Sequence, residues 1–204
     1  MEVTLIYNLE EEWAIIHISK TAGCSIRDCL LKTKPNTHSY PFATKSKEYF
    51  KDIQLGHQTA SFFKTIPLFC KLRYHAVCRN PFSRAVSIFL FKTSDEYVNT
   101  LKMFNGNESV DELLSLKEKG FYHFLTSDFF KEEKTQASWV DEDVNMWRFE
   151  RLSEFEKVFD ITLPTKNASS YTQPWRDYYD DQCKAIVKDV FEEDFLKFDY
   201  SMKF

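Results

Sequence analysis

Two short stretches combine cationic and hydroxyl side chains where a strand pattern changes to a helix pattern. The first, Ser19–Ser25 (SKTAGCS), follows the apolar run at 13–18 and precedes an apolar helical stripe that begins at Ile26. A strand, a short loop and a helix start together point backbone N–H groups and the positive helix end at an anion. The stretch therefore predicts a loop around Lys20 that binds a phosphate-like group.

The second stretch runs from Arg79 to Ser87 and follows a strand pattern at 74–78. Arg79 ends the strand, and Ser87 lies in the second turn of the helix that begins near Pro81. A guanidinium and a hydroxyl arranged in this way can bind a second phosphate. Arg84 lies one turn before Ser87, where it either assists this binding or has a structural role.

The Lys20 loop is not a nucleoside-triphosphate P-loop of the ordinary kind. That motif, G-x-x-x-x-G-K-[ST], places its glycines before the lysine. No glycine precedes Lys20 in this chain, and Gly23 follows it. The remaining parts, a lysine, a glycine and a serine at a helix start, suit a terminal phosphate-like group.

The elements that must position these residues predict an α/β fold. Strand patterns cover 3–7, 13–18, 74–78 and 145–149, and helix patterns cover 24–31, 48–53, 58–63, 110–119, 152–159 and 178–195. The Pro- and Ser/Thr-rich segment 33–47 predicts a loop. Because strand–loop–helix occurs twice, we expect a single domain over 1–204 with a parallel sheet core flanked by helices.

Composition limits the class of protein. Hydrophobic residues make up 43% and aromatic residues 17% of 204 residues, which predicts a folded globular domain. No apolar run reaches the roughly 20 residues that cross a bilayer, and the first residues are acidic where a signal peptide is basic. Five cysteines without a C-x-x-C pair favour reduced thiols in small core positions. We expect a cytoplasmic protein with no membrane partner.

The charge is unevenly distributed along the chain. Residues 1–104 hold 14 Lys and Arg against 9 Asp and Glu, and residues 105–204 hold 13 against 22. The first half therefore suits an anionic ligand, while the second half repels a polyanion such as nucleic acid and tolerates a neutral or cationic partner, unless it is an ordinary solvated acidic surface.

Further motifs follow the two junctions in order. Gly56-His57 lies between them, and an R-F-E-x-L pattern at 148–152, an N-x-S pattern at 167–169 and a D-x-x-x-F-x-Y pattern at 194–200 come after. With the lysine loop and the R-N-P-x-x-R-x-x-S stretch at 79–87, the chain from 13 to 200 resembles the PAPS-dependent sulfotransferases, in the branch with carbohydrate sulfotransferases. The resemblance implies their P-loop-like fold. Ser19 replaces the usual proline, and Cys24 replaces a usual threonine.

The resemblance implies a role for each motif. The donor would be 3′-phosphoadenosine 5′-phosphosulfate, with no metal, and Lys20 would stabilise the departing phosphate. His57 would be the base, and a histidine that caps the following helix is the alternative. Arg79 and Ser87 would bind the 3′-phosphate. The 5′-phosphate would be held by the loop residues Thr21, Ala22, Gly23, Cys24 and Ser25.

Other side chains in the resembling segments have less defined roles. Gln136 lies where the family has a site-lining glutamine, and it is a candidate for donor or acceptor contact. Glu150 is a candidate for substrate contact, with a structural role as the alternative. His17, inside a strand pattern, is expected to be a core residue.

The acceptor is the least defined part of the prediction. The acidic second half favours a hydroxyl of a small neutral or cationic metabolite, for instance a guanidinium alkaloid of the saxitoxin kind. A carbohydrate O-sulfotransferase is the first alternative. A nucleotide-dependent small-molecule kinase and a non-catalytic nucleotide-binding protein are the others.

Overall fold

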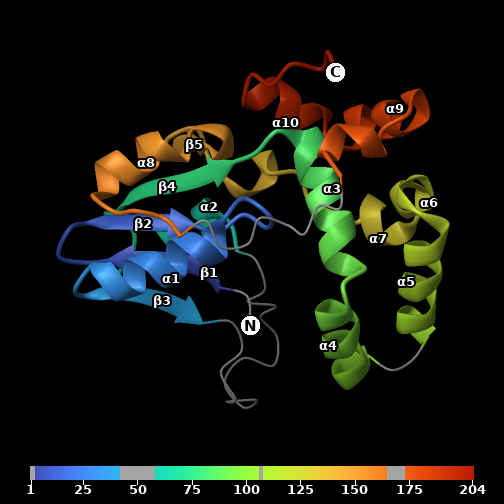
Figure 1. Cartoon of the computed structure of the whole chain (residues 1–204). Helices are drawn as coiled ribbons and strands as arrows, with labels where there is room; N and C mark the ends of the chain where they lie inside the picture. Colours follow the sequence, from blue (N-terminus) through green and yellow to red (C-terminus); the bar gives the residue numbers. More distant parts are fainter. Residues whose placement is uncertain (1–2, 42–57, 106–107, 165–172) are drawn as a thin grey trace. The chain divides into compact units, whose positions relative to one another are not determined.

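The structure, a computed structural model, describes residues 3–41, 58–105, 108–164 and 173–204 (Figure 1). The chain divides into two compact units. The first unit comprises 1–79 with 136–166, and the second comprises 80–135 with 167–204. The single domain over 1–204 stays a prediction, and the predicted short helix at 48–53 lies outside the described residues.

The first unit is built on a five-stranded mixed sheet with the order β3-β1-β2-β4-β5 (Figure 1). The expected α/β class with helices beside a sheet is therefore confirmed. The expected parallel arrangement holds for β2, β4 and β5, but β1 pairs antiparallel with both β2 and β3. The strands are β1 Val3–Asn8, β2 Trp13–Ile16, β3 Thr37–Pro41, β4 Arg73–Cys78 and β5 Asn145–Arg148.

A tight turn joins β1 to β2 and explains the antiparallel pair. The side-chain oxygen of Asn8 accepts hydrogen bonds from the backbone N–H groups of Glu10 and Glu11, each at 3.0 Å. Asparagine makes such local bonds readily, which favours a turn over a helix. Only a few residues separate the two strands, so the chain reverses here, and β2 is the first strand of the parallel part.

The strand β3 contradicts the predicted loop at 33–47. Its residues THSYP are mostly polar and end in proline, which is typical of loops. They form a strand at the edge of the described sheet, where it pairs with β1 in the register Ile6 to Ser39 and Tyr7 to His38. Polar residues and proline are tolerated on an edge strand because one side of its backbone faces no neighbouring strand.

Helices cover both faces of the sheet in the first unit. On one face, α1 (Gly23–Thr33) and α8 (Leu152–Phe159) form one apolar cluster with strand residues. That cluster includes Ile6, Ile15 and Val77 from the strands and Ile26, Leu30, Phe155 and Phe159 from the helices. On the other face Phe69, which follows α2 (Ala60–Lys64), contacts the ring of Tyr7 and accepts a hydrogen bond from the hydroxyl of Tyr74.

A neutral histidine lies within this first face. The indole N–H of Trp147 donates to Nδ1 of His75 at 3.1 Å, and the His75 ring also contacts Phe159 edge to face. Burial, together with a smaller effect of the nearby charge of Arg73, lowers the pKa of His75 to about 4. The native state therefore does not bind a proton here until the pH falls well below the ordinary value of 6.5.

The free energy of unfolding should decrease as the pH falls from about 6.5 toward about 4, because the unfolded chain binds a proton at His75 first. We expect this histidine to account for about 2 kcal/mol, after allowing for its partial solvent access. His75→Asn keeps an acceptor for Trp147 and does not titrate, so its urea unfolding should depend less on pH. His123→Asn, at an exposed position, is the control; an unchanged pH slope in the His75 variant would contradict the expectation.

The second unit is helical and is organised around α3 (Pro81–Lys92). Asn80 caps this helix, since its side-chain oxygen accepts from the N–H of Phe82 at 3.0 Å. The apolar face of α3 packs into a core that includes Val98, Phe121, Phe130 and Val187. The other elements are α4 Asp95–Asn105, α5 Glu108–Lys119, α6 Phe121–Thr126, α7 Asp128–Lys131, η3 Trp175–Tyr178, α9 Asp181–Val190 and α10 Glu192–Lys197.

The prediction of one continuous helix over 178–195 is wrong. The structure has two helices, α9 and α10, which are separated at Phe191 with φ −113° and ψ 25°. Phe191 is fully buried in the same core as Cys183 and Val187. The apolar stripe therefore continues through the break, and for this reason the periodicity alone did not reveal it.

Among the described residues, no helix is long and apolar enough to cross a membrane. All five cysteines are free thiols. Cys29, Cys78 and Cys183 are buried as expected, whereas Cys24 and Cys70 are exposed. The exposed Cys24 is the one that lies in the lysine loop.

Candidate functional site

The lysine loop connects the end of β2 to the start of α1, as the strand–loop–helix pattern predicted. Two of its residues other than glycine have left-handed backbone conformations, Lys20 with φ 66° and Ala22 with φ 73°. The buried hydroxyl of Thr21, between them, donates to the carbonyl of Ile18 at 2.9 Å. A tight loop with left-handed residues turns backbone N–H groups toward one side, an arrangement that favours anions.

The start of α1 is electrostatically open to an anion. Ala22 occupies the N-cap position and makes no side-chain capping bond, and the first turn contains no acidic residue. The first N–H groups of a helix have no partner within the helix, and they form its positive end. Cys24 is exposed in this turn and Ser25 is buried, so the thiol, more than the hydroxyl, faces solvent.

Gly23 is required by a neighbouring side chain. A Cβ atom at this position would lie 1.8 Å from Cδ2 of His17, so the imidazole ring occupies the space beside the glycine. His17 itself is 6% exposed, in agreement with its expected place in the core. The ring therefore supports the start of α1 from within the unit, and glycine allows this close approach.

Arg79 lies directly after β4 and brings the second motif to the lysine loop. Its Nη1 donates a hydrogen bond to the backbone carbonyl of Lys20 at 3.1 Å. The two residues are far apart in sequence, but β2 and β4 are parallel neighbours and end at the same edge of the sheet. The fold thus joins the cationic parts of the two motifs in the first unit.

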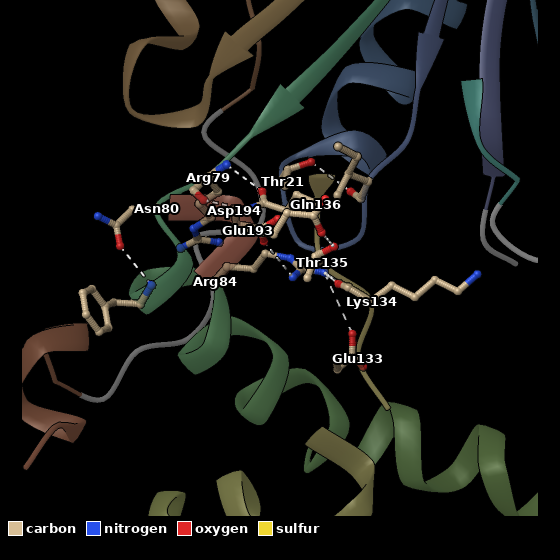
Figure 2. A network of polar contacts seen from close by, with 12 residues as sticks. Thr21, Arg79, Asn80, Arg84, Glu133, Lys134, Thr135, Gln136, Glu193 and Asp194 are labelled. Carbon is tan, nitrogen blue, oxygen red and sulfur yellow. Dashed lines mark hydrogen bonds and ion pairs between the residues drawn. The ribbon is translucent and has the colours of Figure 1, made fainter. Parts of the chain in front are cut away.

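Gln136 is brought to the same place, but its amide is used by the protein backbone. Its Oε1 accepts from the N–H of Arg79 at 2.8 Å, and its Nε2 donates to the carbonyl of Arg79 at 2.9 Å (Figure 2). The side chain is fully buried. The side-chain amide therefore satisfies the backbone N–H and carbonyl groups of Arg79 at the end of β4. Its contact with donor or acceptor stays a prediction.

The end of β5 adds a contact that the sequence reasoning did not assign. The guanidinium carbon of Arg79 lies 4.3 Å from the centre of the Phe149 ring. Phe149 begins the short 3-10 helix η2 (Phe149–Arg151), and the next residue, Glu150, is exposed. The R-F-E pattern indicated this strand end and Glu150 as a candidate residue, but it assigned no role to Phe149.

Three further predicted residues belong to other parts of the chain than the lysine loop and the end of β4. Ser87 belongs to α3 in the second unit, where it is buried. Glu150 keeps its predicted position after β5. His57, the predicted base, lies outside the described residues.

Arg84, for which the sequence allowed two roles, is completely buried in the second unit. Its Nη1 lies 3.9 Å from Oδ2 of Asp194, and its Nη2 lies 4.0 Å from Oε2 of Glu133 (Figure 2). Nη2 also donates to the carbonyl of Lys134 at 3.2 Å. These contacts tie α3 to α10 and to the segment after α7, which is a structural arrangement.

Comparison of the chain with protein-family models, curated proteins and solved structures found no match. In the described part of the chain, no group of three or more His, Cys, Asp or Glu side chains is arranged to hold a metal ion. The function must therefore be argued from the residues of the lysine loop and Arg79.

Proposed function

We propose that this chain is a sulfotransferase that moves a sulfuryl group from 3′-phosphoadenosine 5′-phosphosulfate to an acceptor hydroxyl. The observation that supports this most is the hydrogen bond between Arg79 and the Lys20 carbonyl. It puts two cation-bearing motifs at one sheet edge, beside a helix start without a capping side chain. A donor with separate 5′ and 3′ anionic groups suits two such motifs.

The residues around the loop fit the chemical demands of the donor. Lys20 and the N–H groups from Thr21 to Ser25 would hold the phosphosulfate, and the guanidinium of Arg79 would bind the 3′-phosphate. A guanidinium has five N–H donors, so the bond of Arg79 to a carbonyl is compatible with binding a phosphate as well. Cys24 supplies a thiol where the resembling family has a hydroxyl, so backbone groups carry more of the binding.

The proposed transfer is a direct displacement. The acceptor oxygen forms a bond to sulfur as the bond from sulfur to the 5′-phosphate oxygen breaks, and the acceptor proton passes to a base, proposed as His57. Negative charge grows on the departing phosphate, and Lys20 stabilises it electrostatically. The products are a sulfated acceptor and 3′,5′-ADP, and no metal takes part in this proposal.

The acceptor is proposed to be a small neutral or cationic metabolite. Residues 105–204 carry 22 acidic against 13 basic side chains, which disfavours an anionic polymer. A screen of alcohols, sugars and guanidinium-bearing compounds with labelled donor identifies the acceptor class directly. Transfer to a sulfated polysaccharide in preference to these compounds would contradict this part of the proposal.

A thermal shift measurement tests the proposed donor. With 3′,5′-ADP at about 100 times its dissociation constant and without metal, we expect the melting temperature to rise by about 5–10 °C. The control ligand is 5′-AMP, which lacks the 3′-phosphate and should give a much smaller shift. A shift by Mg·ATP equal to that by 3′,5′-ADP would favour a kinase and overturn the proposal.

A further inference from the structure

The Arg79 side chain is held from two directions within the first unit. Its guanidinium edge donates to the Lys20 carbonyl at 3.1 Å, and its face lies over the Phe149 ring at 4.3 Å. Only 7% of the residue is exposed. A cation over an aromatic face is attracted by the ring quadrupole, most strongly where water is excluded. Phe149 therefore restrains the plane in which the guanidinium lies.

The three contacting residues come from three neighbouring parallel strands. Lys20 follows β2, Arg79 follows β4 and Phe149 follows β5, in the same order as the strands in the sheet. The side-chain amide of Gln136 holds the backbone of Arg79 through two hydrogen bonds. The Arg79 side chain thus spans from a fixed backbone to the loop, with Phe149 supporting one face.

The lysine backbone needs such support. Lys20 has φ 66°, a left-handed conformation that side chains with a Cβ disfavour. A residue in this conformation persists when its surroundings hold it there. The hydrogen bond from Arg79 to the Lys20 carbonyl is one such restraint. Loss of the support under Arg79 would therefore release the loop and move the lysine side chain.

We propose that Phe149 is a positioning residue of this site, which acts through Arg79 to hold the Lys20 loop in its left-handed conformation. Its consequence for catalysis rests on the sulfuryl transfer proposed above, but its consequence for the loop does not. The substitution Phe149→Leu removes the ring face and keeps an apolar side chain. Phe62→Leu, a half-buried phenylalanine in α2 of the same unit, is the matched control.

The first measurement is hydrogen exchange of the loop amides at 18–25 in the full chain without ligand. Phe149→Leu should speed their exchange about tenfold relative to wild type, whereas Phe62→Leu should leave it unchanged. Phe149→Tyr keeps the ring and should exchange like wild type. Equal loop exchange in the two leucine variants would overturn the positioning role, and so would a tyrosine variant that exchanges as fast as Phe149→Leu.

The second measurement is turnover with labelled donor. Phe149→Leu should lower kcat about tenfold because the lysine is misplaced, and it should also raise the donor KM because the guanidinium of Arg79, a proposed donor contact, is no longer held in place. If the wild-type chain transfers no sulfuryl group, the proposed function is wrong, but the conclusion drawn from hydrogen exchange is unaffected. An active wild type with a fully active Phe149→Leu variant would end the inference and leave the function standing.

Discussion

Replacing Arg84 by methionine is expected to lower the free energy of unfolding by about 4 kcal/mol. The guanidinium and the carboxylate of Asp194 are both completely buried, and their charged atoms lie 3.9 Å apart. Methionine keeps most of the volume but removes the guanidinium that lies beside Asp194 and donates to the carbonyl of Lys134. A buried charge that loses its partner is much more costly than an exposed one.

Urea unfolding followed by circular dichroism measures this loss. The double variant Arg84→Met with Asp194→Leu removes both charges and should recover at least half of it. Lys117→Met is the matched control, because its ion pair with Asp95 is exposed on both sides and should contribute little to stability. A loss below about 1 kcal/mol in the Arg84 variant would show that the cluster is not a structural anchor.

The strands that surround the site could be predicted because their burial is unusually complete. All four residues of β2 are buried, and Ala76, Val77 and Cys78 of β4 are buried too. Such runs are apolar without alternation, as in strands covered on both faces. The predicted bounds of α1 and α8 are close to the observed ones, because their apolar residues recur at helical spacing and pack against one face of the sheet.

The two elements that differ from the prediction, β3 and the break at Phe191, also have local causes. The edge strand β3 carries the polar residues Thr37, His38 and Ser39, so its composition indicates a loop, and only its pairing with β1 makes it a strand. The break at Phe191 lies within an apolar stripe that suits either one helix or two. A sequence pattern records which side chains are buried, but it does not record which backbone groups pair.

The sequence predicted the cationic residues of the site, but it did not predict the residues that hold them in place. Lys20 and Arg79 belong to recognisable motifs, and their meeting follows from two parallel strands that end together. The role of Gln136 depends on its reach to the backbone of Arg79, and that of Phe149 on a ring lying under a guanidinium. Interactions of this kind depend on three-dimensional placement, and no spacing along the chain records them.

Removing the charge of Lys20 is expected to lower kcat for sulfuryl transfer about 10³-fold, if the proposed reaction is the one this chain performs. The charge on the departing phosphate grows as the bond to sulfur breaks, so the lysine acts mainly on the transition state. Lys20→Ala should therefore change the affinity for 3′,5′-ADP less than about tenfold. Steady-state kinetics with labelled donor and calorimetry with 3′,5′-ADP measure the two effects.

The backbone of Lys20 provides a control that separates charge from strain. Alanine at φ 66° is strained in the same way as lysine, whereas glycine accepts this conformation without cost. Lys20→Gly should therefore unfold at a free energy about 1 kcal/mol higher than Lys20→Ala, while both variants lose the same turnover. Lys32→Ala, in the last turn of α1, the helix that follows the loop, should keep full activity. If Lys20→Ala retained more than a tenth of wild-type turnover, Lys20 would not be the residue that stabilises the leaving group.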